Sequence, residues 1–108
     1  MPLPNELSPG EVKRLIDSGR AFVLLDVRQP EEVDVAHIAG SVHIPMGEIP
    51  GRLHELDPDA DIVVYCHHGI RSADVAAFLR RHEFGSVANL SGGIEAWSLT
   101  IDRSLARY

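Results

Sequence analysis

Short apolar runs alternate with helix-like segments along the whole chain, and this alternation is the feature that most constrains the fold. The clearest runs are Phe22–Val27, Ile62–Tyr65 and Val87–Leu90, which are rich in the Val, Ile and Leu of buried strands. Ile62–Tyr65 is the most apolar of them, and we place it at the centre of the sheet, where both faces need apolar neighbours. The alternation predicts an α/β protein with a mostly parallel sheet.

The first helix has an explicit start signal. Ser8 is followed by Pro9 and, three positions on, by Glu11, which together form a capping box with proline at the first helical position. Gly19 is a natural stop for this helix.

Other elements follow from turn residues and periodicity. We expect a short helix from Pro30 to about Val35, a short strand over Ser41–Pro45, and a helix with Ile49, Leu53 and Leu56 on one face. A longer helix should then run to about Glu83, with Arg80 and Arg81 outward, and stop at Gly85. The last helix should carry Trp97 and follow the turn Ser91-Gly92-Gly93.

Length and charge narrow the class of protein. The 108 residues fit one domain, and a net charge of −6 disfavours nucleic acid and anionic membrane surfaces as partners. Apolar runs such as Ala21–Leu25 and Ile62–Cys66 are far too short to span a membrane, and the first six residues lack the pattern of a signal peptide. A single cysteine excludes an internal disulfide, so we expect a reducing cytoplasm.

Cys66 lies where a central strand ends and a loop leads into a helix. Ligands of open α/β sheets bind at such strand ends, and the helix start directs unpaired N–H groups at the loop. Gly69 allows the backbone to curl with its amides inward, and Arg71 adds a positive charge. These features favour a thiolate, which is the nucleophilic form of cysteine, and an anionic substrate. The alternative is an inert core cysteine.

The absence of a second cysteine limits the chemistry available to Cys66. No resolving thiol exists within the chain, so a covalent intermediate on Cys66 has to be discharged by an outside acceptor. This predicts a two-step, ping-pong transfer.

Four segments in this order resemble the signatures of single-domain rhodaneses, which are sulfurtransferases. They cover nearly the whole chain from about Leu7 and are Leu25-Asp26-Val27-Arg28-Gln29-Pro30-Glu31-Glu32, His37-Ile38-Ala39-Gly40-Ser41-Val42-His43-Ile44-Pro45, the loop Cys66-His67-His68-Gly69-Ile70-Arg71-Ser72, and Leu90-Ser91-Gly92-Gly93-Ile94-Glu95-Ala96-Trp97. Ser41 departs from the alanine that is common in the second signature.

The resemblance implies a rhodanese-like domain over residues 1–108, with a central, mostly parallel five-stranded sheet and helices on both faces. It implies that Cys66 takes the outer sulfur of a donor such as thiosulfate and passes it as a persulfide to cyanide, a small thiol or a protein thiol. The substrate-binding residues would be His67, His68, Gly69, Ile70, Arg71 and Ser72, with their amides cradling the outer sulfur and Arg71 closing the loop around an anionic donor. No cofactor is implied.

Two other functions compete with this interpretation. Phosphatases and arsenate reductases that share the fold need a larger loop, whereas Cys66 and Arg71 have the shorter C-x4-R spacing. The chain could also be a non-catalytic or partner-dependent module that delivers or senses sulfur.

Four polar residues in or near the loop have expected roles of their own. Asp26 and Arg28 end the neighbouring strand, and we assign them a supporting role, with Asp26 bonding the loop backbone and Arg28 pairing with Glu32. His67 and His68 are expected at the mouth of the site, where partial protonation could assist an anion. They lack the ligand spacing of a zinc site, so we expect no metal.

Overall fold

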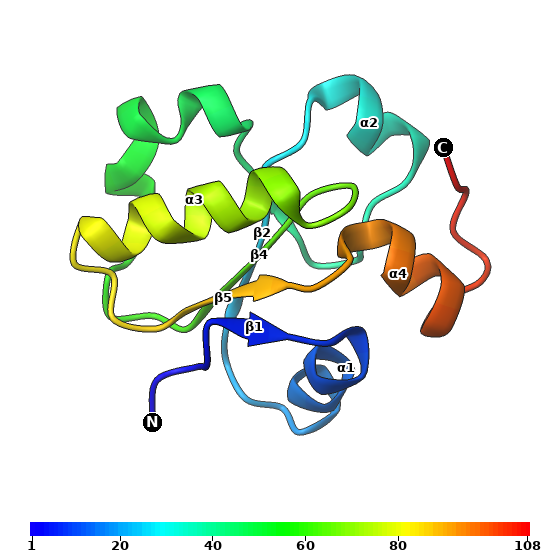
Figure 1. Ribbon diagram of the computed structural model, residues 1–108, viewed down its shortest axis with the longest axis horizontal. Helices are drawn as coiled ribbons and strands as arrows, with labels where there is room; N and C mark the ends of the chain where they lie inside the picture. Colours follow the sequence, from blue (N-terminus) through cyan, green and yellow to red (C-terminus); the bar gives the residue numbers. More distant parts are fainter.

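The computed structural model describes all residues, 1–108, as a parallel sheet wrapped by helices (Figure 1). Its elements, in chain order, are β1 (Glu6–Leu7), α1 (Pro9–Asp17), β2 (Val23–Asp26), α2 (Pro30–Val35), β3 (Val42–His43), the 3-10 turns η1 (Met46–Glu48) and η2 (Pro50–Glu55), β4 (Ile62–Tyr65), α3 (Ile70–Arg81), β5 (Val87–Leu90) and α4 (Gly93–Thr100). The five strands lie in the order β1-β5-β4-β2-β3, and every neighbouring pair is parallel.

Strand β4 occupies the centre of the sheet, as its apolar sequence predicts. Its side chains alternate between two cores, because successive residues of a strand point to opposite faces. Ile62, Val64 and the following Cys66 join the cluster under α3, whereas Val63 and Tyr65 join the cluster under α1 and α4. The predicted five-stranded sheet with helices on both faces is therefore confirmed.

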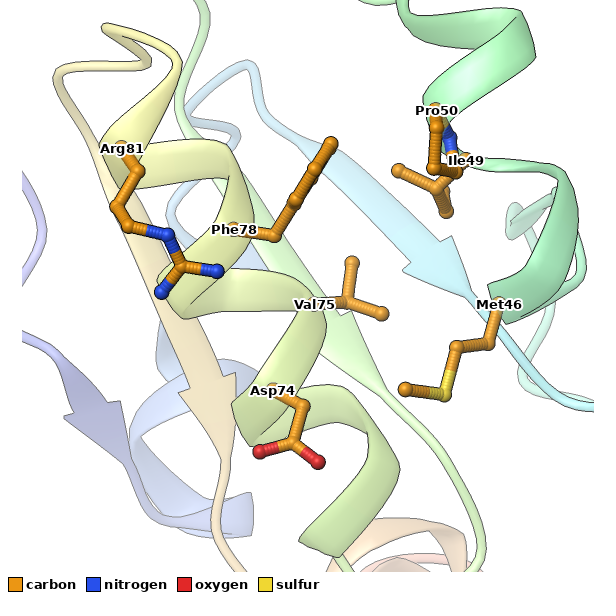
Figure 2. A pocket seen from close by; sticks show the side chains of 7 residues that line it. All are labelled: Met46, Ile49, Pro50, Asp74, Val75, Phe78 and Arg81. Carbon is orange, nitrogen blue, oxygen red and sulfur yellow. The ribbon is translucent and has the colours of Figure 1, made fainter.

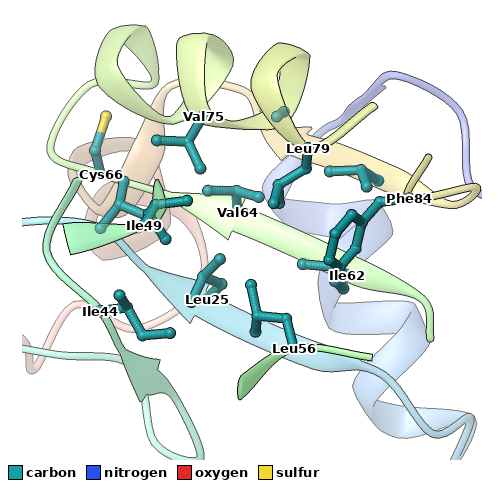
Figure 3. Packing of buried hydrophobic residues seen from close by; sticks show 13 residues of the cluster. Leu25, Ile44, Ile49, Leu56, Ile62, Val64, Cys66, Val75, Leu79 and Phe84 are labelled. Atoms are coloured by element: carbon teal, nitrogen blue, oxygen red, sulfur yellow. The ribbon is translucent and has the colours of Figure 1, made fainter. Parts of the chain in front are cut away.

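The core under α3 is the larger of the two and runs along the whole length of β4 (Figure 3). Leu79 and Phe84 pack near the start of the strand, beside Ile62, while Val75 and Ile49 lie toward Cys66. Cys66 is thus continuous with an apolar core on one side, and its polar surroundings come from the loop that follows it.

Helix α1 begins as its sequence predicts. The Ser8 hydroxyl accepts a hydrogen bond from the amide of Glu11, and the Glu11 carboxylate accepts one from the amide of Ser8. Gly19, just past the end of the helix, has φ +74°, which is the left-handed conformation expected of a glycine stop. Sequence analysis missed the two-residue strand β1, which is too short for a periodic pattern.

The region around Ile49 differs from the single helix that we expected. It forms two 3-10 turns, because Pro50 removes a backbone donor and Arg52 adopts a non-helical φ of −121°. Ile49 and Leu56 are nevertheless buried and Leu53 packs partly against the core, so the apolar spacing is satisfied by a different backbone.

The end of α3 also differs from the prediction. The helix stops at Arg81, and Glu83, rather than Gly85, adopts the left-handed conformation, with φ +67°. Arg80 turns back to the sheet, where its Nη2 donates to the carbonyl of Val87 at 2.9 Å, instead of pointing outward. No helix of the chain has the length and apolar character needed to cross a membrane.

Candidate functional site

The sulfur of Cys66 lies inside the loop between β4 and α3 and is surrounded by hydrogen-bond donors. The residue is 1% exposed. The amide of Gly69 donates to Sγ at 3.2 Å, the amide of Ser72 at 3.3 Å and the hydroxyl of Ser72 at 3.3 Å. The loop therefore presents three donors to one atom, which is the arrangement that stabilises a negative charge.

Two effects compete over the pKa of the Cys66 thiol. Burial raises it, while the donors on Ser72 and Gly69 and the charge of Arg71 lower it, and the lowering effects prevail. The net pKa is lower than that of an ordinary cysteine, so a larger thiolate fraction is present near neutral pH. These donors favour the nucleophilic interpretation of Cys66 over that of an inert core cysteine.

Glycine backbones shape the loop. Gly69 has φ +95°, and any side chain there would press against the backbone of Gly92. Gly93 has φ +62°, and any side chain there would collide with the carbonyl oxygens of Cys66 and His67. These close approaches let the start of α4 bind the loop, since the amide of Ile94 donates to the Cys66 carbonyl at 2.9 Å.

Asn89 is a buried polar residue of the site that sequence analysis missed. It lies on β5 and is 4% exposed. Its Nδ2 donates to the carbonyl of Gly69 at 3.1 Å, and its Oδ1 accepts from the Ser72 hydroxyl at 2.5 Å. A polar residue in the middle of the apolar run Val87–Leu90 was the available signal, because buried amides need partners.

Arg71 points to α2 rather than into the loop. Its Nη1 and Nη2 bind the two carboxylate oxygens of Glu32 at 2.7 and 2.9 Å. These bonds are the main reason that the pKa of Glu32 falls to about 2. Arg71 therefore acts on the sulfur by its charge, while the carboxylate holds its guanidinium in place.

The predicted pairing of Arg28 with the Glu32 carboxylate is wrong. The fully buried guanidinium of Arg28 instead binds the carboxylate of Asp26, with Nη2 at 2.7 Å and Nε at 2.9 Å. It reaches only the main-chain carbonyl of Glu32, because the carboxylate of Glu32 is turned toward Arg71. Asp26 also accepts a hydrogen bond from the amide of Arg28, so this carboxylate bonds the backbone of the loop that follows β2.

The two histidines of the loop differ in exposure. His68 faces solvent, whereas the ring of His67 is stacked between it and Tyr108, whose centroid is 3.9 Å away. Burial lowers the pKa of His67, and the charge of His68 lowers it further, which disfavours the protonated form that we expected to assist an anion. Its Nε2 is buried without a hydrogen-bond partner.

Tyr108 connects the side chains of Arg28 and Glu32. Its hydroxyl accepts from Nη1 of Arg28 at 2.8 Å and donates to the carboxylate of Glu32 at 2.8 Å. Through Glu32 this links the Asp26–Arg28 pair to Arg71. The sequence contains no local signal for this contact, since Tyr108 lies 76 positions from Glu32.

The structure brings together some predicted site residues and separates others. Gly69 and Ser72 contact the sulfur, Arg71 stands nearby, and Ile70 is 74% exposed at the start of α3. No three His, Cys, Asp or Glu side chains gather closely enough to hold a metal ion.

The open pocket shown in Figure 2 lies away from the sulfur. It has a volume of about 250 Å³ and lies along the side of α3, lined by Met46, Ile49, Pro50, Asp74, Val75, Phe78 and Arg81. Cys66 is therefore enclosed by its own loop and does not line this pocket.

Known proteins share both the sequence and the fold. The profile of the rhodanese-like domain matches residues 8–100. The chain is 39% identical to the putative sulfur carrier protein YrkF of Bacillus subtilis over 86% of its own length, 35% identical to a sulfurtransferase of Allochromatium vinosum, and 36% identical to the thiosulfate sulfurtransferase GlpE of Pseudomonas aeruginosa.

Coverage of these relatives varies. The chain spans 50% of YrkF and 26% of the probable adenylyltransferase/sulfurtransferase MoeZ of Mycobacterium tuberculosis, but 88% of the Allochromatium protein and 81% of GlpE.

Solved structures agree with the sequence comparison. A rhodanese-related protein from Thermoplasma volcanium, 31% identical, superposes with a TM-score of 0.79 over 87% of this chain and 90% of the other. A rhodanese-like domain protein from Staphylococcus aureus, 27% identical, gives 0.84 over 97% and 99%. The match over 93 consecutive residues and the shared architecture show that this chain belongs to the rhodanese-like domain family.

Proposed function

We propose that the protein is a sulfurtransferase that moves a sulfane sulfur from an anionic donor such as thiosulfate to cyanide or a thiol, through a persulfide on Cys66. The observation that carries the proposal is the convergence of three donors, from Gly69 and Ser72, on the only cysteine sulfur of the chain. Relatives named as sulfurtransferases support sulfur transfer in general.

In the first half-reaction the Cys66 thiolate attacks the outer sulfur of the donor. A new S–S bond forms, the donor's own S–S bond breaks, and its electron pair leaves on sulfite. The negative charge then lies on the outer sulfur, and we propose that the loop amides from His67 to Ser72 hold it there. The positive charge of Arg71 favours the approach of an anion despite the acidic chain.

In the second half-reaction the acceptor attacks the outer sulfur. The S–S bond of the persulfide breaks, and Cys66 leaves as the thiolate that the same donors stabilise. Each half-reaction is a displacement at sulfur, so the cycle needs no cofactor and follows ping-pong kinetics.

The sulfur of Cys66 has little access to solvent, so substrates need a route to it. Cys66 is 1% exposed, whereas His68 and Ile70 of the same loop face solvent. We propose that donor and acceptor reach Sγ between these two side chains. A free thiol at such a site needs a reducing compartment, and we propose the cytoplasm.

The first experiment weighs the intact protein after incubation with thiosulfate. Wild-type protein should gain one sulfur atom, and later treatment with cyanide should remove it with release of thiocyanate. Cys66→Ser should gain nothing, and protein alkylated at Cys66 beforehand should also gain nothing. The proposal is abandoned if wild-type protein stays unmodified, or if the serine variant carries the extra mass.

A partner-dependent sulfur-delivery module is the second candidate, favoured by the burial of Cys66 and by the likeness to a putative sulfur carrier. It predicts slow transfer from the persulfide to cyanide but fast transfer to a protein thiol. Equal rates with both acceptors would count against it. Hydrolysis of an aryl phosphate that depends on Cys66 would instead favour the phosphatase alternative.

A further inference from the structure

The hydroxyl of Ser72 lies between two acceptors that it cannot serve at once. Its oxygen is 3.3 Å from Sγ of Cys66 and 2.5 Å from Oδ1 of Asn89. A serine hydroxyl carries one hydrogen, so it donates to the sulfur or to the amide. The other two donors to the sulfur are backbone amides and have no alternative partner within reach. The Ser72 hydroxyl is therefore the one switchable donor.

The hydrogen-bond network determines which way the Asn89 amide faces. Its other end lies 3.1 Å from the carbonyl of Gly69 and 3.1 Å from the carboxylate of Glu6, and both of these groups only accept. The NH2 group must face them, so the carbonyl oxygen faces Ser72. Asn89 is 4% exposed and Ser72 is fully buried, which leaves little room for water to replace either partner.

We propose that Asn89 is a positioning residue that acts through Ser72 and decides when the hydroxyl serves the sulfur of Cys66. This inference rests on the proposed function, since it assigns Asn89 a part in setting the reactivity of the same nucleophile. Asn89 does not touch the sulfur itself.

The proton positions follow from counting donors. In the neutral thiol, S–H donates to the Ser72 oxygen and Ser72 donates to Asn89, so each group has a partner. When the thiol loses its proton, the Ser72 hydrogen turns to the sulfur, and the Asn89 oxygen loses its only donor. Asn89 thus opposes ionisation and leaves a thiolate that is less stabilised and more nucleophilic.

A persulfide changes the balance again. Its negative charge lies on the outer sulfur, beyond the inner Sγ that Ser72 faces. The hydroxyl is then free to return to Asn89, and the loop amides remain to bind the outer sulfur. Asn89 would in this way favour the state that follows sulfur uptake over the free thiolate.

Charged and titratable groups on the elements around the loop can also influence the ionisation of the sulfur, and the charge of Arg71 does so directly. Most of them keep their surroundings in all the variants below, so their effects cancel in the differences: Arg71 on α3, Glu32 on α2, His67 and His68 in the loop, Asp26 at the end of β2, Arg28 after it and Glu95 on α4. Glu6 on β1 is different, because it loses the hydrogen bond from Asn89 when Asn89 is replaced, and the Ser72→Ala background described below separates this effect from the one carried by the hydroxyl.

The test measures how the rate of alkylation of Cys66 by iodoacetamide depends on pH. In Asn89→Leu the Ser72 hydroxyl has only the sulfur as an acceptor, so it stabilises the thiolate. The midpoint, which is the pH at which the alkylation rate is half of its maximum, should therefore fall by about one pH unit. A purely structural role predicts the reverse, because losing the bond to Gly69 loosens the donor loop and raises the midpoint. Asn5→Leu, the same change at an exposed asparagine, should leave the midpoint where it is.

The companion experiment repeats the change in a Ser72→Ala background. Without the hydroxyl, Asn89→Leu should no longer lower the midpoint. A midpoint that rises or stays constant in Asn89→Leu, or that falls equally without Ser72, overturns the inference. Asn89→Ala replaces the leucine variant if the latter does not fold.

A third measurement needs no substitution. In wild-type protein the carbon-13 signal of the Asn89 side-chain carbonyl should titrate with Cys66, because the carbonyl loses its donor as the thiolate forms. A signal that stays constant through that titration also overturns the inference. Alkylation and this titration do not require sulfur transfer, so a failure here is distinct from a failure to form the persulfide.

Discussion

The two ends of the central strands are equally buried but chemically opposite. At the amino ends Ile62 lies beside Leu79 and Phe84 in the apolar core that also contains Val87 (Figure 3), and the buried polar side chain there, Ser86, donates to Asp61. At the carboxyl ends the buried side chains are polar or charged, and these are Asp26, Arg28, Ser72 and Asn89. The first end depends mainly on volume and apolar surface, whereas the second needs a specific partner for each of four buried polar or charged side chains. Stability and chemistry are therefore separated along a strand of four residues.

The largest effect is expected from removing one member of the buried ion pair between Asp26 and Arg28. Arg28→Ala leaves the Asp26 carboxylate without its guanidinium in a site of 0% exposure. We expect the free energy of unfolding to fall by about 3–5 kcal/mol, because an uncompensated buried charge is costly. Urea denaturation measures this. Arg28→Lys keeps the charge but not the two-pronged guanidinium, so its free energy of unfolding should fall by less. A fall below about 1 kcal/mol in the alanine variant would contradict the comparison.

A matched change at the apolar end should reduce stability without altering the chemistry. Leu79→Ala removes a fully buried side chain of α3, and we expect a loss of about 3 kcal/mol from transfer and cavity effects. The alkylation midpoint of Cys66 in the folded protein should stay at the wild-type value. A shifted midpoint would mean that the two ends of the strands are coupled.

The ion pair beside the loop gives a smaller effect that depends on pH. The folded pKa of Glu32 is about 2, below its ordinary value of 4.5, so the stability that it contributes is present above pH 4.5 and is lost as pH falls toward 2. Glu32→Gln should cost about 1 kcal/mol at pH 7, since both side chains are partly exposed.

The difference between wild type and Glu32→Gln should then shrink steadily between pH 4.5 and pH 2. Other carboxylates with lowered pKa values remain in both proteins and cancel in the difference. Urea denaturation at several pH values tests this, and a difference that does not depend on pH would show that the Glu32 charge is not involved.

The two ends also differ in how far the sequence predicts them. The central place of Ile62–Tyr65 follows from its apolar residues alone, and the capping box at Ser8 follows from local spacing. The donor loop around Cys66 is local too, because Gly69 and Ser72 lie within six positions of the sulfur.

Polar partners from distant segments are less predictable. Arg28 lies one helical turn from Glu32 in the sequence, and that spacing predicted an ion pair between them; the chain instead pairs Glu32 with Arg71, 39 positions away. Periodicity identifies which side chains are buried, but the choice among several acceptors depends on tertiary geometry. Asn89 was missed for the same reason, since its partners Ser72 and Gly69 belong to another element.

The smallest expected effect concerns Tyr108, where the polar network reaches the surface. Burial is the main reason that the pKa of its phenol rises to about 12, and the chain's other tyrosine, Tyr65, is raised to about 12 in the same way. The folded protein should therefore show no tyrosinate absorbance near pH 10, and Tyr108→Phe should halve the signal that develops above it. That variant keeps the ring stacked on His67 and loses only the hydroxyl bonds to Arg28 and Glu32, so we expect a stability loss of about 0.5–1 kcal/mol. Tyrosinate that forms near pH 10 in folded wild-type protein but not in Tyr108→Phe would show that Tyr108 is detached from the site. The hydrogen-bond network would then end at Glu32.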